Sequence, residues 1–385
     1  MRFDFKDDYT VYRLNEICKR VTRKNKNIES TLPLTISAQY GLVDQITFFN
    51  KSVASSNLEG YYLLKNGEFA YNKSYSKDYP WGAIKRLDKY EQGCLSTLYI
   101  CFDINKTCNS DYLVHYFESP KWYKQVSDIA GEGARNHGLL NISADDFFQT
   151  KHRFPSLDEQ VKVSKLLNLI ETRIQTQNKI IDDYMTYRNA IVDYFFESLS
   201  SDWNRIKLSN ILKEYSELHV KDNSIVHATL SKEGIFPKTD RYDRDFLVKD
   251  EDKKYKVTHL NDICYNPANL KFGVITRNTI GDCIISPIYV TFKIENGFLP
   301  KFVELLVTRK RFISRARKYE QGTVYERMAV NSSDLLSMYV SIPSLNTQQT
   351  IVNIINNIDN KISNEKELLK LYRAQKVYLL KNMFI

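Results

Sequence analysis

The sequence predicts an α/β protein: two similar mixed α/β domains joined by two long helices that pair as an antiparallel coiled coil, with pseudo-twofold symmetry. Three observations support this fold class. The pattern Pro-Ser-Leu-x-x-Gln occurs at residues 155–160 and again 188 positions later, at 343–348. Each copy opens a long heptad pattern that lacks proline and glycine, and each follows a segment with strand-like stretches. The repeat predicts domains at 1–156 and 199–344, and helices at 157–198 and 345–385.

The domain at 1–156 is expected to contain strands rich in β-branched and aromatic residues. We expect one strand at 95–102, with its counterpart at 284–292 in the domain at 199–344. Glycines also recur between the domains, because Gly82 aligns with Gly273 and Gly133 aligns with Gly322. Insertions and deletions separate these anchors, whereas the helical segments align without any. Domains that differ in sequence, joined to helices of constant length, are typical of a recognition protein whose loops determine its target.

The two helical segments carry apolar residues at alternating steps of three and four, which is typical of a coiled-coil seam. At about 1.5 Å per residue, the first segment would extend roughly 60 Å, too long for a core helix of a small domain. Seam positions of the first helix align with those of the second in the same order: Leu167, Ile170, Ile174, Ile181 and Tyr184 with Ile355, Ile358, Ile362, Leu369 and Tyr372.

The formal net charge is +9, and the two predicted domains carry +8 of it. A mild basic excess permits nucleic-acid binding without requiring it. We found no apolar run of about 18 residues and no signal peptide, so a cytoplasmic location is expected. The six cysteines have no C-x-x-C spacing, which predicts reduced and mostly buried thiols.

Motifs for catalysis are missing from the sequence. There is no phosphate-binding G-x-x-x-x-G-K-[ST] loop and no G-x-G-x-x-G after a strand. The segment 266–269, Asn-Pro-Ala-Asn, resembles the Asn-Pro-Pro-aromatic element of amino-methyltransferases but lacks the aromatic residue that stacks on a flipped base. The six histidines have no metal-ligand spacing. We therefore predict no catalytic residue and no metal site.

Taken together, the doubled features make the chain similar to the specificity subunit of a type I restriction-modification system. The carriers are the two Pro-Ser-Leu-x-x-Gln openings, the helices that end in apolar clusters at 194–196 and 382–384, Trp203-x4-Leu208, and the segments around Gly133 and Gly322. Tyr9 stands where the second domain has Trp203, so the match is weaker at the first residues.

The resemblance implies a non-catalytic DNA-recognition subunit. Each domain would be a target recognition domain that reads one half of an interrupted double-stranded DNA site, and the paired helices would set the spacing between the halves. The seam helices would dock two methyltransferase subunits, and the complex would recruit restriction subunits. S-adenosylmethionine, ATP and magnesium are expected in those partners, with no cofactor bound by this chain.

Candidate DNA contacts follow from residue chemistry, because Arg, Lys, Asn and Gln supply most contacts to phosphates and base edges. The residues after Gly133 and Gly322 are the first candidates for base reading: Arg135, Asn136, His137, Tyr325 and Arg327. A basic cluster is the candidate for phosphates, with Arg309, Arg311, Arg315 and Lys318. Further candidates are Asn72, Lys73, Lys85 and Arg86 in the first domain, and Asn269, Lys271 and Arg277 in the second.

Ordinary explanations compete with each assignment. The loops after the glycines could be surface turns, and the basic cluster could be a solvated helix. For the whole chain, the alternative is a coiled-coil adaptor that binds proteins and shows no salt-sensitive affinity for DNA. A self-sufficient methyltransferase or nuclease is disfavoured by the missing motifs.

Overall fold

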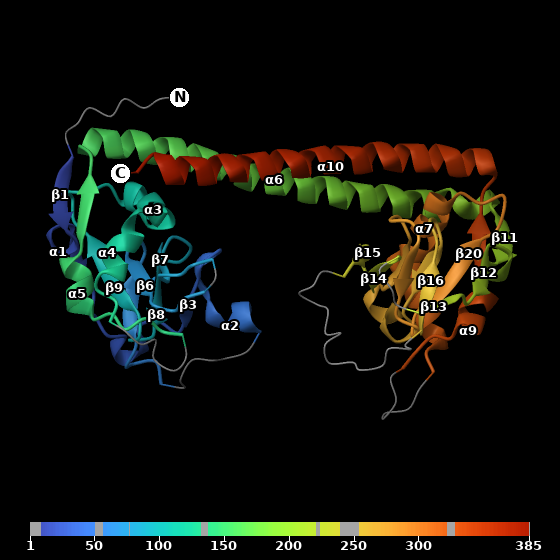
Figure 1. Cartoon of the computed structure of the whole chain (residues 1–385), viewed down its shortest axis with the longest axis horizontal. Coiled ribbons are helices and arrows are strands. Elements are labelled where there is room, and N and C mark those ends of the chain that lie inside the picture. The colour runs from blue at the N-terminus through green and yellow to red at the C-terminus, as the bar shows by residue number, and fades with distance from the viewer. Residues whose placement is uncertain are drawn as a thin grey trace. The chain divides into compact units, whose positions relative to one another are not determined.

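The computed structural model describes residues 9–50, 57–76, 78–131, 138–220, 224–238, 254–321 and 328–384. The chain divides into two compact units: unit 1 comprises residues 1–179 and 367–385, and unit 2 comprises residues 180–366. Two long helices, α6 (Leu157–Ser198) and α10 (Leu345–Asn382), each contribute one part to each unit (Figure 1). The bounds of α6 agree with the predicted helix, whereas α10 ends at Asn382 and leaves Met383 and Phe384 outside it.

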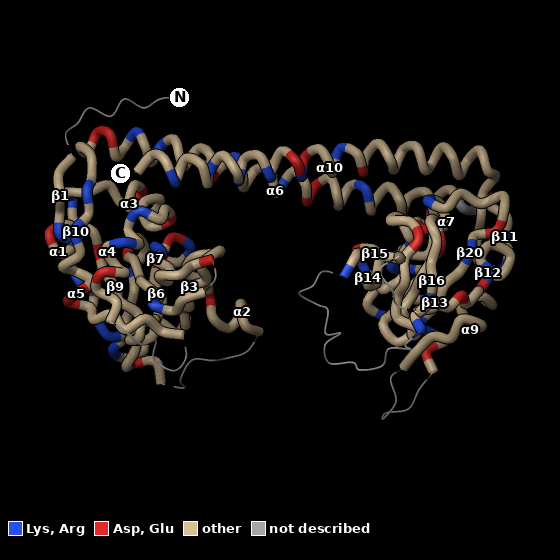
Figure 2. The backbone as a smooth tube through the Cα atoms, viewed as in Figure 1, with Lys and Arg blue, Asp and Glu red and all other residues tan. Residues whose placement is uncertain are grey.

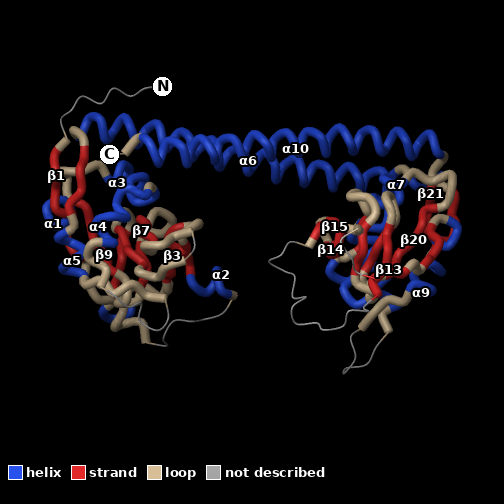
Figure 3. Tube along the Cα trace, viewed as in Figure 1, coloured by secondary structure: helices blue, strands red, loops and turns tan. Residues whose placement is uncertain are grey.

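Unit 1 has a mixed α/β body built around an antiparallel sheet of order β2-β9-β6-β7 (Figure 3). Pairs β1-β10, β3-β4 and β5-β8 form three smaller ladders. The strands are β1 (Thr10–Arg13), β2 (Cys18–Arg20), β3 (Leu34–Ser37), β4 (Gly41–Asp44), β5 (Tyr62–Lys65), β6 (Phe69–Asn72), β7 (Ala83–Arg86), β8 (Gln92–Leu95), β9 (Ile100–Ile104) and β10 (Lys151–Phe154). The helices are α1 (Leu14–Ile17), η1 (Lys26–Ile28), α2 (Gln45–Phe49), α3 (Ser110–Glu118), η2 (Pro120–Trp122), α4 (Tyr123–Ser127) and α5 (Ala144–Gln149).

Unit 2 repeats this plan with an antiparallel sheet of order β12-β20-β17-β18. A five-stranded sheet, β13-β16-β19-β14-β15, and the pair β11-β21 complete it. The strands are β11 (Asn204–Lys207), β12 (Leu212–Tyr215), β13 (Leu218–Val220), β14 (Val226–Ser231), β15 (Gly234–Pro237), β16 (Lys254–Thr258), β17 (Ile263–Tyr265), β18 (Ile275–Arg277), β19 (Cys283–Ile285), β20 (Val290–Ile294) and β21 (Tyr339–Ile342). The helices are η3 (Ser200–Asp202), η4 (Leu208–Asn210), η6 (Pro267–Phe272), α7 (Pro300–Thr308), α8 (Lys310–Ala316), η7 (Arg317–Tyr319) and α9 (Ser332–Ser337).

The strands predicted at 95–102 and 284–292 are wrong as single elements. In unit 1, β8 ends at Leu95 and β9 begins at Ile100, and in unit 2 a similar break separates β19 from β20. A turn fills each break, closed by a hydrogen bond from the Tyr99 N–H to the Ser96 carbonyl (3.2 Å) and from the Tyr289 N–H to the Ser286 carbonyl (3.1 Å). The β-rich composition outweighed the turn residues that are present, Ser96 in the first break and the Ser286-Pro287 pair in the second, because neither turn contains glycine.

Each body closes its core on the end of a long helix. The core of unit 1 includes Phe384, which is 1% exposed and packs against Tyr112 and Tyr116 with ring centroids 5.2 and 5.7 Å away. The core of unit 2 includes Phe196 of α6, stacked on Phe302 at 5.2 Å. These two phenylalanines stand 188 positions apart, so the apolar cluster that ends each helical repeat has the same role in both units.

The repeated glutamine of the Pro-Ser-Leu-x-x-Gln pattern attaches each long helix to its body. Gln160 donates to the carbonyl of the proline five residues before it (2.9 Å) and accepts from the N–H of Asn109, the residue that caps α3 (2.9 Å). Gln348 makes the same two contacts in unit 2, at 3.2 Å to its proline and 3.0 Å from the N–H of Leu299, which caps α7. Both glutamines are buried, so their hydrogen bonds satisfy groups that water cannot reach.

The predicted seam positions are buried or half-buried. Seven of them are buried, namely Leu167, Ile170, Ile174, Ile181, Ile355, Ile362 and Leu369. The other three are half-buried: Tyr184, Ile358 and Tyr372. This burial fits coiled-coil packing within each unit.

Polar contacts show how the helix segments run within unit 1. Lys376 of α10 pairs with Glu171 of α6 at 2.7 Å, and Arg373 donates to Asn178 at 3.4 Å. Residue numbers rise along one helix as they fall along the other, so the two segments are antiparallel.

The same ion pair occurs in unit 2. There Arg188 of α6 pairs with Asp359 of α10. Arg188 stands 188 positions before Lys376, and Asp359 stands 188 positions after Glu171. The sequence repeat is therefore also a repeat of contacts.

Candidate nucleic-acid interface

Five of the predicted base-reading residues lie outside the described part of the chain: Arg135, Asn136, His137, Tyr325 and Arg327. The described residues on either side of them are joined by backbone hydrogen bonds. The N–H of Gly131 donates to the carbonyl of Asn141 at 3.3 Å, and Gln321 and Ala329 exchange two bonds of 2.9 Å.

Asn72 and Lys73 lie beside residues that follow Arg135, Asn136 and His137 in the chain. The Lys73 ammonium donates to the carbonyl of Ile142 (3.0 Å), and its backbone carbonyl accepts from the N–H of Leu140 (3.0 Å). Asn72 ends β6, and its side chain accepts from the N–H of Ser74 (3.0 Å). The structure thus brings two predicted contact residues next to the described residues that follow Arg135, Asn136 and His137.

Asn269 and Lys271 have a corresponding place in unit 2. They belong to η6, whose first residue, Pro267, accepts from the N–H of Val330 at 3.2 Å. The hydroxyl of Tyr265 also donates to the carbonyl of Val330, at 3.0 Å. Lys271 is exposed and Asn269 is half-buried. Each unit therefore places one group of predicted contacts beside the described residues that flank its predicted base-reading residues.

Other predicted contacts are neutralised by acids of the same unit. Lys85 pairs with Glu118, and Arg86 pairs with Asp88 (2.6 Å) and with Asp111 (2.7 Å). In unit 2, Arg277 pairs with Glu304 at 3.1 Å and donates to Asn261 at 2.7 Å. All three cationic side chains are less than a fifth exposed. Their contact with DNA stays a prediction, and these intramolecular partners weaken it.

The basic cluster at 309–318 has mixed surroundings. Arg311 pairs with Glu197 of α6 (2.8 Å), and Arg315 donates to the carbonyl of Tyr339 (2.7 Å). Arg309 lies over the ring of Phe196, with its guanidinium carbon 3.9 Å from the ring centroid, while Lys318 is exposed. Figure 2 shows Lys and Arg interleaved with Asp and Glu over the bodies of both units.

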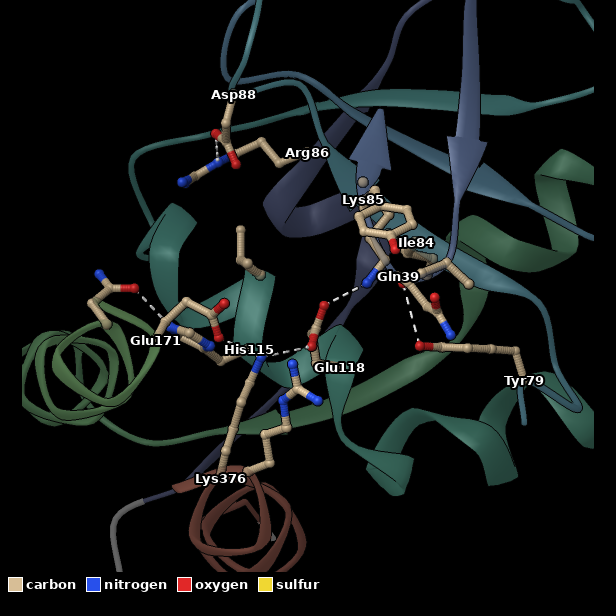
Figure 4. A pocket seen from close by; sticks show the side chains of 16 residues that line it. Gln39, Tyr79, Ile84, Lys85, Arg86, Asp88, His115, Glu118, Glu171 and Lys376 are labelled. Atoms are coloured by element: carbon tan, nitrogen blue, oxygen red, sulfur yellow. Dashed lines mark hydrogen bonds and ion pairs between the residues drawn. The ribbon is translucent and has the colours of Figure 1, made fainter. Parts of the chain in front are cut away.

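A pocket of about 700 Å³ in unit 1 contains a charged cluster that the sequence did not reveal. Figure 4 shows Lys85 of β7 and Lys376 of α10 on either side of Glu118, at the end of α3. Burial alone would raise the pKa of Glu118, but the two ammonium groups outweigh it and hold this pKa at about 2. One carboxylate therefore ties the sheet, α3 and the long helix together.

His115 lines the same pocket and is 3% exposed. Its Nε2 lies 2.8 Å from the side-chain oxygen of Asn168, which places the proton on Nε2. Its Nδ1 is buried without a partner among the described residues. Burial lowers the pKa of His115, so the ring is neutral at pH 7.

His259 of unit 2 lies between two carboxylates. Its Nδ1 is 3.0 Å from Asp282 and its Nε2 is 3.1 Å from Glu217, and its ring stacks on Tyr215. Hydrogen bonds to Asp282 and then to Glu217 raise the pKa of His259 above its ordinary value of 6.5. In the sequence, Asp282 is 23 residues and Glu217 is 42 residues from the histidine, so no local pattern predicts this cluster.

The His259 cluster predicts a pH-dependent stability. Because the folded-state pKa is raised, the stabilisation is fully present below pH 6.5 and is lost as pH rises through the folded value. We expect His259→Gln to lower the free energy of unfolding by about 1 kcal/mol at pH 5.5, a modest effect because the side chain is about a third exposed and solvent screens its ion pairs. At pH 9 the substitution should have almost no effect on the free energy of unfolding. Denaturant unfolding of both proteins at the two pH values measures this difference. A constant difference across pH would contradict the assignment.

The structure also bears on the excluded chemistry. All six cysteines are buried and free, which confirms the prediction of reduced, mostly buried thiols. Within the described ranges, no group of three or more His, Cys, Asp or Glu side chains could hold a metal ion. No helix in the described part of the chain is long and apolar enough to cross a membrane.

Comparisons with known proteins found one matching family model and similar solved structures. Residues 252–371 match the family model for the type I restriction modification DNA specificity domain. A chain from a structure concerned with complex assembly and conformational transition of the type I R-M system is similar with a TM-score of 0.61 and 12% identity, over 98% of both chains. The type I restriction-modification S subunit from M. genitalium is similar with a TM-score of 0.52 and 14% identity, over 100% of this chain and 98% of that chain. No curated protein matches the sequence.

Proposed function

We propose that this chain, whose residues 252–371 match a type I restriction-modification DNA specificity domain, is the DNA sequence-recognition subunit of such a system. The family match confirms the resemblance predicted from the doubled sequence. It covers residues 252–371 alone, and the similarity of fold extends over the whole chain. In this function the chain is non-catalytic, and methyl transfer and ATP-dependent cleavage belong to partner subunits that bind S-adenosylmethionine, ATP and magnesium.

Each unit would read one half of an interrupted site in double-stranded DNA. Support comes from contacts that recur at equivalent positions of the two units. The contacts of Gln160 recur at Gln348, and the ion pair Glu171–Lys376 recurs as Asp359–Arg188. They fit two units built on the same plan, each of which would present one reading body. The residues that would read bases differ between the two bodies, so the halves of the site should have different sequences.

The DNA-contact proposal is sharpened by the placement of the predicted residues. Asn72 and Lys73 in unit 1, and Asn269 and Lys271 in unit 2, lie beside the flanks of the segments that carry Arg135, Asn136, His137, Tyr325 and Arg327. Exposed Lys318 would contact phosphate, and its loss would weaken binding about equally on all sequences.

The long helices would dock two methyltransferase subunits, and restriction subunits would join through them. Large apolar side chains on these helices remain exposed in the chain alone, which is typical of surfaces that bind a protein partner. They include Leu169, Met185, Tyr187, Tyr194, Leu371, Val377 and Tyr378. A chain with this function would lie in the cytoplasm.

The helices are also proposed to set the spacing of the site. Inserting four residues after Thr176 of α6, with a matched insertion after Lys366 of α10, adds about one helical turn to each helix. We expect the gap between the half-sites to change while both half-site sequences stay the same. Coexpression with the partner methyltransferase and a genome-wide map of methylated adenines measures this. An unchanged gap would remove the spacing role, and a map without any bipartite motif would contradict the proposed function.

A further inference from the structure

A basic pocket of about 370 Å³ lies in unit 2, where the last turns of α6 meet α8 and β21. Its lining includes three arginines, Arg309, Arg311 and Arg315, and one acid, Glu197. Apolar residues form the rest of its wall, among them Phe196 and Phe312, which are buried. The lining therefore carries a net positive charge next to an apolar surface.

Arg309 is the group in this pocket that most needs an anion. It is half-buried and stacks on Phe196. The only hydrogen bond of its side chain among the described residues is a long one of 3.5 Å to the carbonyl of Leu306. No described carboxylate forms an ion pair with it. Burial, aided by Arg311 and Arg315, lowers the pKa of Arg309 to about 10 against the opposing effect of Asp193 and Glu197. A desolvated guanidinium without a paired acid is costly, and an incoming oxyanion would lower that cost.

The corresponding place in unit 1 lacks this feature. Arg309 follows the last residue of α7, and Ser119 holds the same position after α3. In the stretch from Ser119 to Val126 the cations are Lys121 and Lys124, whereas the stretch from Arg309 to Ala316 has three arginines and a lysine. The repeat built the same helix junction twice, but three arginines gather only at the junction in unit 2.

We propose that this pocket binds an acidic segment of a protein partner, through Asp or Glu carboxylates that contact Arg309, Arg311 and Arg315. The inference rests on the proposed function, in which the long helices dock protein subunits. The sequence made these three arginines candidates for phosphate contacts, and two observations favour a protein partner over DNA instead. The pocket is walled by the end of α6, and exposed apolar side chains lie close to it in the chain, namely Tyr194, Leu199 and Tyr339.

Protein interfaces combine arginine with aromatic side chains in this way. Duplex DNA offers phosphates on a convex and rigid surface, which suits an exposed cation better than a guanidinium stacked inside a junction. A flexible acidic side chain can enter the pocket and form bidentate hydrogen bonds with a guanidinium.

The test uses the full chain and two fluorescent probes, an octaglutamate peptide and a short DNA duplex, with octaglutamine as the neutral control peptide. We expect Arg309→Gln with Arg315→Gln to weaken octaglutamate binding at least about tenfold while duplex binding is unchanged. Arg311→Gln, at an exposed position, should weaken it by a smaller factor, and Arg309→Lys should restore only part of the affinity because it lacks the fork.

The matched control is Lys121→Gln with Lys124→Gln in unit 1, which removes the same charge from the equivalent stretch and should leave peptide binding unchanged. Weaker duplex binding with normal peptide binding would make the pocket a DNA phosphate site and overturn the proposal. Equal peptide binding by wild type, double variant and control would show that no anion site exists there. If the wild-type chain did not bind duplex DNA, the proposed function would be contradicted instead. Peptide binding is measured independently of DNA binding, so the two failures can be told apart.

Discussion

Replacing Phe384 with alanine is expected to destabilise unit 1 by about 3 to 5 kcal/mol, the cost typical of removing a fully buried aromatic side chain. Phe384 is 1% exposed and fills the space between the aromatic rings of α3 and the end of α10. Hydrogen exchange monitored by mass spectrometry measures the effect, because it reports α3 in unit 1 and α7 in unit 2 separately. Exchange should rise in α3 and stay unchanged in α7.

Two matched variants make this result specific. Phe196→Ala removes the repeat-equivalent side chain and should raise exchange in unit 2 instead. Tyr378→Ala alters a side chain of α10 that is 67% exposed and should change neither unit. If Phe384→Ala raised exchange equally in both units, the division of the cores described above would be wrong.

Replacing Glu118 with leucine is expected to cost about 3 kcal/mol, because it leaves the mostly buried ammonium of Lys85 without its partner. Lys376 retains Glu171, so the loss falls mainly on the contact between α3 and β7. The folded-state pKa of Glu118 is about 2, below its ordinary value of 4.5. Its stabilisation is therefore present above pH 4.5 and is lost as pH falls through about 2. Denaturant unfolding should show the gap between variant and wild type narrowing below pH 4.5.

The rescue variant separates charge from shape. Glu118→Leu combined with Lys85→Met replaces the pair by apolar side chains of similar length, and we expect it to recover most of the lost stability. Lys370→Met changes a lysine that is 77% exposed and should have little effect. A double variant no more stable than Glu118→Leu alone would mean that packing, and not the unpaired ammonium, causes the loss.

The sequence predicted the frame of this protein well, for a physical reason. A heptad seam and a repeated capping pattern are local signals, so the bounds of α6 and the burial of Leu167 and Ile355 could be read from spacing alone. The glutamine of the repeated pattern was visible in the sequence, but its contact with the cap of α3 or α7 was not. That contact spans about 50 residues in each unit.

The predicted DNA contacts fared differently, because charge pairing is not local. Lys85 and Arg277 have the residue types that contact phosphates, yet each meets an acid about 30 residues away in its own unit. The turns inside 95–102 and 284–292 were hidden by β-branched and aromatic residues, since composition reports burial better than it reports chain reversal. The base-reading assignments at Arg135 and Arg327 stay predictions.

Unit 1 is assembled from two separate stretches of the chain, 1–179 and 367–385, and this constrains how the polypeptide folds as it leaves the ribosome. Unit 2 occupies one continuous stretch, 180–366, and can complete its core as soon as that stretch has emerged. Unit 1 cannot, because Leu380, Met383 and Phe384 join side chains made hundreds of codons earlier. During translation the body of unit 1 must wait, with part of its aromatic core open, for the helical turn around Leu380. A premature stop codon near Lys366 would leave that core incomplete while unit 2 stays intact.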